Sequence, residues 1–261
     1  MKKKTAIEKL SKNALSVETA TICDNLSFAA SEAYKRLRTN ILFSFADNTA
    51  CRVVGITSSL RGEGKSVTAI NTAYSMALSG KKVLLIDGDL RIPSITQKLS
   101  FKPGAGLSNL LVGLDKVGDT FQRYTSQTSN TYFDVIPSGK LPPNPAELLG
   151  SKRMESLLAS LKQYYDYIII DLPPISAVTD ALIVSKITDG MIVVVRQDYC
   201  RTDLLKETVE QLKFVEANII GFVYNGAHDG GKGYGRYGRY GRYGRYGRYY
   251  SRYYTNTEKE T

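Results

Sequence analysis

The sequence has no uninterrupted run of about 18 apolar residues, the length that a membrane-spanning helix needs. Its opening stretch, MKKKTAIEKLSKN, also lacks the apolar segment of a secretory signal peptide. These two absences predict a cytoplasmic protein. Apolar residues still make up 43% of the 261, which is ample for the core of one sizeable domain with appendages.

Cysteine is scarce, and Cys23, Cys51 and Cys200 lie far apart in the chain. An odd number of cysteines without the close spacing of metal ligands argues against a disulfide framework and against a zinc site. We therefore expect three reduced thiols.

The middle of the chain lacks an excess of charge of either sign, although the net charge is +10. Residues 1–13 contain five Lys and one Glu, residues 231–261 contain eight Lys or Arg and two Glu, and the residues between them sum to zero. A body without a positive excess is not expected to hold a nucleic acid. The two basic ends are compatible with a membrane surface.

Short apolar stretches rich in Val and Ile alternate with stretches that carry a helical apolar stripe. This alternation predicts an α/β fold, a mostly parallel sheet flanked by helices on both faces, with ligands beyond the carboxyl ends of the strands. An amphipathic segment, residues 26–46, is predicted to form a helix before the first strand. The expected strands are 52–58, 81–89, 132–138, 165–173, 191–197 and 218–226, and the expected main helices are 66–80, 151–165 and 201–215.

The stretch SSLRGEGKS follows the first expected strand and precedes a helix. It matches the phosphate-binding pattern G-x-x-x-x-G-K-[ST], except that Ser59 replaces the first glycine. Gly62 and Gly64 let main-chain N–H groups turn toward phosphate oxygens. Lys65 can reach the outer phosphates and Ser66 can bind Mg²⁺. The strand before and the helix after favour a P-loop over a glycine-rich turn with an incidental lysine.

Aspartates follow two of the expected strands. VLLIDGDLR places Asp87 and Asp89 just past one strand, and IIIDLPP places Asp171 at the same point of another. Each aspartate by itself is more typical of a turn or a helix cap. Together with a P-loop, the three carboxylates at one sheet edge predict a magnesium site and a proton acceptor.

These motifs carry a family resemblance. SSLRGEGKS, LLIDGDLR and IIIDLPP resemble the Walker A, A′ and B boxes, and a tyrosine cluster follows them near the end of the chain. The set is similar to the bacterial tyrosine kinases that regulate capsule and exopolysaccharide synthesis, over residues 26–254. The resemblance implies a P-loop NTPase fold and ATP-dependent tyrosine autophosphorylation. The G-x-G-x-x-G loop and HRD motif of eukaryotic protein kinases do not occur in the sequence.

The resemblance also implies a role for each motif residue. Lys65 would hold the phosphates, while Ser66, Asp87 and Asp171 would position Mg²⁺. Asp87 would also orient or deprotonate the attacking hydroxyl, because tyrosine has an ordinary pKa near 10 and needs an acceptor at neutral pH. Asp89 would support the metal site. ATP would be bound by Ser59, Gly62, Glu63, Gly64, Lys65, Ser66, Val67 and Asn225, the last of these in contact with the base.

Two parts of the resemblance leave alternatives open. Arg91 ends the A′ box and would assist tyrosine or phosphate positioning, or else form a helix-terminal ion pair. SEAYKRLRTN resembles the family's E-x-x-R-x-x-R element, which implies assembly of a homo-oligomeric ring. Glu32 and Arg38 match it, but Lys35 stands at the first arginine and lacks the planar fork of that side chain. We expect a weaker ring, or an ordinary solvated helix face.

The resemblance divides the chain into a basic flexible N-terminus (1–25), an oligomerisation helix (26–46), a P-loop ATPase or kinase domain (47–230) and a disordered tyrosine-rich tail (231–261). It further implies a membrane-embedded activator of the polysaccharide chain-length type, a cognate phosphotyrosine phosphatase and peripheral recruitment to the inner face of the cell membrane. The expected phosphorylation sites are Tyr234, Tyr237, Tyr240, Tyr243, Tyr246, Tyr249, Tyr250, Tyr253 and Tyr254.

Two other functions compete with this interpretation. ParA- and MinD-type ATPases share the P-loop and the sheet, and would use the basic ends for DNA or a membrane; their loop usually has a second lysine where this chain has Leu60. The Arg-Gly-Tyr repeats also resemble disordered nucleic-acid-binding segments. A solubilising or sticky tail is the plain structural alternative.

Overall fold

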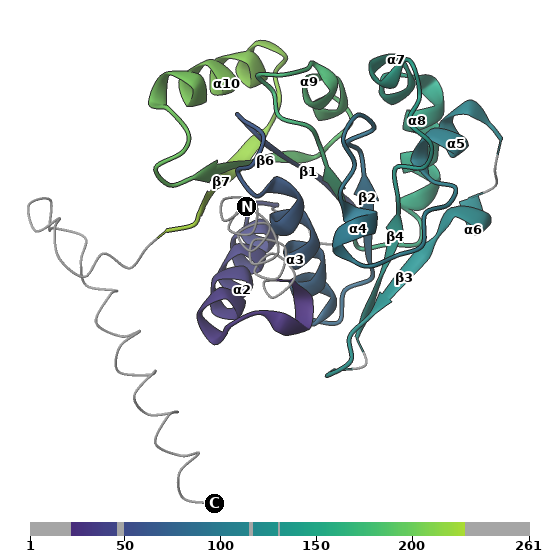
Figure 1. The fold of residues 1–261 in the computed structure, drawn as a ribbon, viewed down its shortest axis with the longest axis horizontal. Coiled ribbons are helices and arrows are strands. Elements are labelled where there is room, and N and C mark those ends of the chain that lie inside the picture. Colours follow the sequence, from purple (N-terminus) through teal and green to yellow (C-terminus); the bar gives the residue numbers. More distant parts are fainter. Residues whose placement is uncertain (1–21, 46–49, 115–116, 130, 228–261) are drawn as a thin grey trace, which may run out of the picture. The chain divides into compact units, whose positions relative to one another are not determined.

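The computed structural model describes residues 22–45, 50–114, 117–129 and 131–227. Within them the chain forms a seven-stranded sheet in the order β3–β4–β2–β5–β1–β6–β7 (Figure 1). Neighbouring strands are parallel except β3 and β4, which are antiparallel. In chain order the strands are β1 (Arg52–Ser58), β2 (Val83–Asp87), β3 (Gln122–Thr125), β4 (Tyr132–Ile136), β5 (Tyr167–Asp171), β6 (Gly190–Arg196) and β7 (Ile219–Asn225).

The central strands are apolar throughout because helices cover both faces of the sheet. Every residue of β2 and β5 is buried, which is the pattern of a parallel sheet with two covered faces. One core lies under η1 (Cys23–Asn25), α2 (Phe28–Phe43), α3 (Lys65–Ala77) and α4 (Ile95–Lys98). The other lies under α5 (Leu107–Val112), α7 (Pro145–Leu149), α8 (Lys152–Leu161), α9 (Asp180–Ser185) and α10 (Thr202–Phe214). The short helix α6 (Val117–Thr120) precedes β3.

The predicted α/β class, the mostly parallel sheet and its six predicted strands are confirmed. The segment predicted as a helix before the first strand contains α2, which packs on α3. The prediction lacks β3 and the short helices. The four residues of β3 alternate between half-buried and exposed side chains, so their strand conformation depends on pairing with β4 rather than on a local apolar run.

Several sequence-based expectations concern the edges of the described region. Residues 22–25, assigned above to the basic N-terminal segment, pack on the body, where Ile22 and Cys23 are buried. The three cysteines are free thiols, as predicted. Residues 1–21 and 228–261, which include all nine tail tyrosines, lie outside the described residues.

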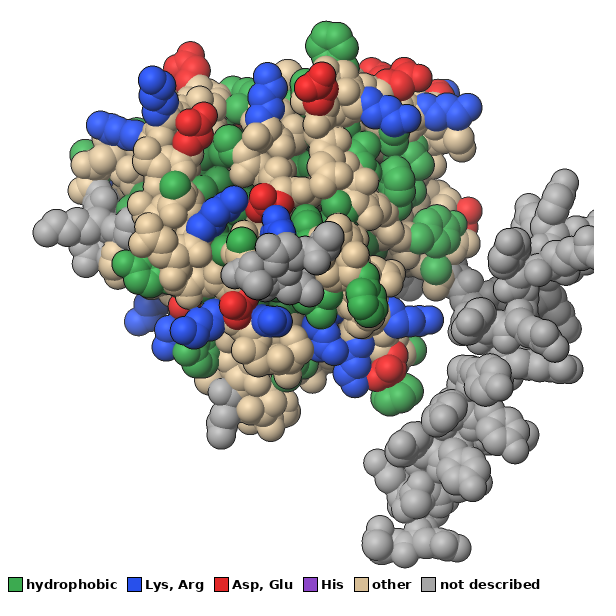
Figure 2. Space-filling model, turned by 180° about the vertical axis from the view of Figure 1, so that it is seen from behind, with side chains coloured by type: hydrophobic (Ala, Val, Ile, Leu, Met, Phe, Trp, Pro, Cys, Tyr) green, Lys and Arg blue, Asp and Glu red, His purple; other side chains and the backbone are tan. Residues whose placement is uncertain are grey.

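Among the described helices, none combines the length and the apolar character needed to cross a bilayer. Figure 2 shows Lys and Arg side chains on the same face of the body as Asp and Glu.

Candidate active site

The loop between β1 and α3 has the conformation that a P-loop requires. Gly62 and Gly64 have φ angles of 91° and 95°, in the left-handed region that favours glycine. Gly64 is the N-cap of α3, so the unpaired N–H groups of the first helical turn open onto the loop. Ser59, which replaces a glycine of the pattern, is buried and accepts a hydrogen bond of 2.9 Å from Thr208 Oγ1 on α10. The serine therefore fits this loop.

Residues from the ends of β6 and β7 hold the P-loop in place. The buried carboxylate of Glu63 accepts a hydrogen bond of 3.3 Å from the main-chain N–H of Arg196. Asn225 Nδ2 donates to the Glu63 carbonyl oxygen at 2.8 Å, and Tyr199 Oη donates to the Arg61 carbonyl oxygen at 2.8 Å. Asn225, predicted to contact the base of ATP, thus contacts the backbone of the loop in this structure.

The lysine of the loop lies among the predicted aspartates. Lys65 Nζ is 3.0 Å from Asp89 Oδ2, 3.7 Å from Asp171 Oδ1 and 3.4 Å from Ser66 Oγ. Strands β2 and β5 are neighbours, and their register places Asp87 opposite Asp171. The parallel sheet thereby brings together an ammonium group and three carboxylates from loops far apart in the sequence.

Burial strengthens the electrostatics of this cluster. Burial raises the pKa of Asp87 to about 8, and the charge of Asp171 contributes in the same direction. Burial also raises the pKa of Asp171, against the lowering effect of Lys65. Burial alone would lower the pKa of Lys65, but the charges of Asp171 and Asp89 outweigh it and the pKa is raised. One ammonium group thus faces three acidic side chains, and a cation bound beside them would favour their charged forms.

The available oxygen atoms fit Mg²⁺. Asp87 Oδ1 and both carboxylate oxygens of Asp171 are buried and have no hydrogen-bond partner within the described part of the chain. No group of three or more His, Cys, Asp or Glu side chains among the described residues is arranged to hold a metal by itself. Mg²⁺ in nucleotide sites usually takes one or two carboxylates together with water and substrate phosphates. The donors therefore suit an ion that binds together with a nucleotide.

Arg91 makes the ion pair that the sequence left as an alternative. Its Nε is 2.8 Å from Asp180 Oδ2 and its Nη2 is 2.9 Å from Asp180 Oδ1, a two-point contact. Asp180 begins α9 and its side chain is fully buried. Sequence reasoning missed this residue, because an aspartate at the start of a short helix has the same local signal as an ordinary cap. The predicted part of Arg91 in tyrosine or phosphate positioning stays a prediction.

The three residues predicted for oligomerisation do not form one group on α2. Glu32 and Lys35 form an exposed ion pair of 2.7 Å. Arg38 Nη1 instead donates a hydrogen bond of 2.7 Å to the carbonyl oxygen of Ser75 on α3. Arg38 therefore fastens α2 to the body, and the Glu32–Lys35 pair stays available on the surface. Their role in a ring remains a prediction.

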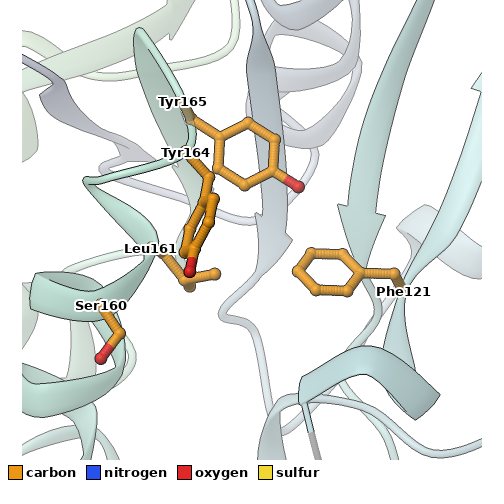
Figure 3. A pocket seen from close by; sticks show the side chains of 5 residues that line it. All are labelled: Phe121, Ser160, Leu161, Tyr164 and Tyr165. Carbon is orange, nitrogen blue, oxygen red and sulfur yellow. The ribbon is translucent and has the colours of Figure 1, made fainter.

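A separate apolar pocket of about 480 Å³ lies near the C-terminal end of α8. It is lined by Phe121, Ser160, Leu161, Tyr164 and Tyr165, and Figure 3 shows Phe121 facing the two tyrosines across it. This lining has no cationic side chain, and no predicted site residue belongs to it. It is therefore not the phosphate site.

Comparison with known proteins adds a further line of evidence. Residues 51–220, which include the P-loop and the three aspartates, match the AAA domain family. Tyrosine-protein kinase YwqD of Bacillus subtilis is 38% identical over 196 residues, 75% of this chain and 81% of that protein. The kinase domain of the Escherichia coli tyrosine kinase ETK is 31% identical with a TM-score of 0.74, over 84% of both chains. MinD of Pyrococcus horikoshii, complexed with Mg-ADP, is 25% identical with a TM-score of 0.54, over 66% of this chain and 69% of that chain.

Proposed function

Because the chain belongs to the bacterial tyrosine-protein kinase family, built on an AAA domain, we propose that it transfers the terminal phosphate of ATP to tyrosine hydroxyls, those of its own tail included. One observation carries the proposal. Lys65 Nζ lies 3.0 Å from Asp89 and 3.7 Å from Asp171 at the P-loop, where oxygens of Asp87 and Asp171 receive no hydrogen bond from the described residues. This is an arrangement for binding phosphates together with a divalent cation.

Each residue of the site has a separate role in phosphoryl transfer. The main-chain N–H groups of the loop and the N-terminus of α3 bind the phosphates, and Lys65 neutralises charge on the group being transferred. Ser66 and Asp171 hold Mg²⁺, which neutralises phosphate charge when it is bound. Asp87 accepts the proton of the attacking tyrosine, for which burial suits it by raising the pKa of its carboxyl. Asp89 orients Lys65 through their ion pair.

The wider setting of the activity follows from the family resemblance. The kinase regulates capsular or exopolysaccharide synthesis, is activated by the cytoplasmic part of a membrane-embedded partner, and is recruited to the inner face of the membrane. A phosphatase reverses the modification. Assembly into a ring through α2 is supported by the exposed pair of Glu32 and Lys35, which leaves charged groups for a neighbouring copy.

A MinD- or ParA-type ATPase is the second candidate, favoured by the shared fold of MinD. Against it stands Leu60, at the position where those ATPases carry a second lysine. The two functions differ in the acceptor of the phosphate, which is water in an ATPase and a tyrosine in a kinase. The chemical fate of the phosphate therefore distinguishes them.

The test is prolonged incubation of the full chain, at a concentration high enough for its activity without the activator to be measured, with Mg²⁺ and ATP labelled at the terminal phosphate, followed by mass spectrometry of the tyrosines. We expect phosphotyrosine in residues 234–254, and none in Lys65→Met, because the variant loses the cation that contacts the phosphates. Lys82→Met is the matched control. Lys82 is exposed and precedes β2, at the edge of the sheet opposite the P-loop, so this variant should keep full activity.

Two results would contradict the proposal. If purified Lys65→Met formed phosphotyrosine at the normal rate, the residues around Lys65 would not be the active site. Steady release of inorganic phosphate without any phosphotyrosine, at high protein concentration and with the same Lys65 dependence, would assign the chain to the ATPases instead.

A further inference from the structure

The contact between Arg91 and Asp180 joins the two loops that carry the carboxylates of the site. Arg91 lies two residues beyond Asp89 in the loop after β2. Asp180 lies at the end of the loop that starts at Asp171 and leads into α9. Both nitrogen–oxygen distances are below 3.0 Å, so the planar fork of the guanidinium is matched to the carboxylate.

The burial of the two partners is unequal. The side chain of Asp180 is 0% exposed, whereas that of Arg91 is 38% exposed. A buried carboxylate is unfavourable unless a cation and hydrogen bonds compensate it, and Arg91 supplies both. Because Asp180 is fixed in the core, it determines where Arg91, and with it the loop after β2, has to lie.

Asp89 connects this bridge to the lysine of the P-loop. Its Oδ1 accepts hydrogen bonds from the main-chain N–H groups of Arg91 at 3.3 Å and Ile92 at 3.0 Å. Its Oδ2 accepts a hydrogen bond of 3.0 Å from Lys65 Nζ. One carboxylate therefore contacts both the backbone that carries Arg91 and the group that binds the phosphates. A shift of that backbone moves the partner that orients Lys65.

We propose that Asp180 is a positioning residue for phosphoryl transfer, which acts by fixing Arg91 so that Asp89 keeps Lys65 directed at the phosphates. The proposal rests on the proposed kinase function and adds a residue to it. The two-point contact matters because a point charge would neutralise Asp180 without fixing the direction of the side chain. Arg91→Lys therefore separates positioning from neutralisation.

The experiment measures kcat and the KM for ATP of the full chain with Asp180→Asn, with Arg91→Lys and with both changes. Rates are expressed per nucleotide-binding site, titrated with a fluorescent Mg-nucleotide, so that unfolded protein does not contribute. We expect each single variant to lose roughly tenfold to a hundredfold in kcat with a KM within about threefold of wild type, because misplacement by about 1 Å has effects of that size. The double variant should be no worse than the more impaired single variant.

Arg123→Lys and Asp134→Asn are the matched controls. Arg123 and Asp134 form a similar two-point pair between β3 and β4, with Arg123 Nε 2.7 Å from Asp134 Oδ1 and Nη2 3.3 Å from Oδ2. These changes should leave kcat near that of wild type. Asp180→Glu keeps the carboxylate and should recover part of the activity lost in Asp180→Asn.

Several outcomes would overturn the inference. Arg91→Lys with a normal kcat would show that the charge alone suffices, and equal losses in the Arg123 and Arg91 series would show a general effect on folding. Additive losses in the double variant would show that the two residues act separately. Absence of phosphotyrosine in the wild type would contradict the proposed function instead. The Arg91–Asp180 contact would then be tested by comparing the rates of ATP hydrolysis of the same variants.

Discussion

Single residues of the P-loop are constrained by backbone geometry as well as by chemistry. Gly64 has a φ of 95°, and a Cβ added there would meet the side chain of Asn225. Gly80, in the turn after α3, has a φ of 82° and open space around the position of a Cβ. The two glycines share the conformational requirement and differ in their surroundings, which makes them a matched pair.

Gly64→Ala is expected to abolish binding of Mg-nucleotide, because the new methyl group displaces Asn225 and distorts the loop that presents its N–H groups. Gly80→Ala should bind normally, although both variants should lose about 1–2 kcal/mol of stability from the left-handed conformation. Titration with a fluorescent nucleotide and thermal unfolding check this. Normal binding by Gly64→Ala would show that the loop has another conformation when it binds nucleotide.

Asp171→Asn tests whether the site is electrostatically strained before nucleotide binds. Asp171 is fully buried, with Lys65 Nζ 3.7 Å from its Oδ1 but no hydrogen bond from any described residue, and burial raises its pKa against the opposing effect of that lysine. Replacement by the neutral amide should remove phosphoryl transfer and raise the stability of the nucleotide-free protein by about 1 kcal/mol. Asp180→Asn, which breaks a two-point hydrogen-bonded ion pair with Arg91, should instead lower the stability. Differential scanning calorimetry without nucleotide measures both, and destabilisation by Asp171→Asn would contradict this account.

At the scale of elements, one carboxylate makes several contacts between the segment before α2 and the rest of the body. Asp24 in η1 accepts hydrogen bonds from Tyr74 of α3, from Tyr124 of β3, and from Ser126 and Thr128 of the turn that follows β3. Partial burial would raise the pKa of Asp24, but these hydrogen bonds outweigh it and hold the pKa well below its usual range. One side chain thus links η1 to both a helix and an edge strand.

Asp24→Asn should destabilise the protein by about 1–2 kcal/mol at neutral pH, because hydrogen bonds to a charged acceptor are lost at a partly exposed site. A lowered pKa in the folded state means that the stabilisation is complete above the unfolded pKa of about 3.9 and is lost as the pH falls through the folded value. Urea unfolding between neutral pH and pH 3 measures the difference between variant and wild type. The difference in the free energy of unfolding between wild type and Asp24→Asn should become smaller below about pH 4.

Asp203→Asn is the control, since Asp203 pairs with Arg201 on the exposed surface. It should have little effect at any pH. If the stability difference between Asp24→Asn and wild type did not change with pH, the shape of the side chain, rather than its charge, would stabilise the segment before α2.

At the scale of the whole molecule, we expect phosphorylation between copies of the chain. A flexible Gly-rich chain of about 30 residues would span roughly 30 Å, so length alone would permit transfer at its own site or at a neighbour's. Assembly through α2 would raise the effective concentration of the tail at the neighbouring site. A chain with all nine tail tyrosines changed to Phe should therefore phosphorylate Lys65→Met chains in a mixture. Absence of label on the Lys65→Met chains in this mixture would exclude transfer between copies.

Phosphorylation should then weaken the assembly. The tail segment 231–261 has eight Lys or Arg and two Glu, and each phosphotyrosine adds about −1.5 to −2 charges, so roughly three to four of them cancel its positive charge. Further phosphates make the tails repel one another. Sedimentation should show smaller species after full phosphorylation, and an unchanged profile would exclude this switch.

The sequence by itself determined the features that depend on near neighbours in the chain. Runs of Val and Ile predict the strands, and glycines spaced around Lys65 predict the phosphate loop, because strand propensity and a left-handed turn are local properties. Aspartates at strand ends predict a shared site, since parallel strands end at one edge.

Only the tertiary structure decided which of these groups touch. Arg91 pairs with Asp180 across 89 residues, and Asp24 accepts a hydrogen bond from Ser126 across 102 residues. Asn225 ends β7, which pairs with β6, and in the structure its side chain donates to the carbonyl oxygen of Glu63 across 162 residues. These partners have no local signal, because an ion pair or a hydrogen bond depends on the distance between side chains in space and leaves no periodicity in the chain.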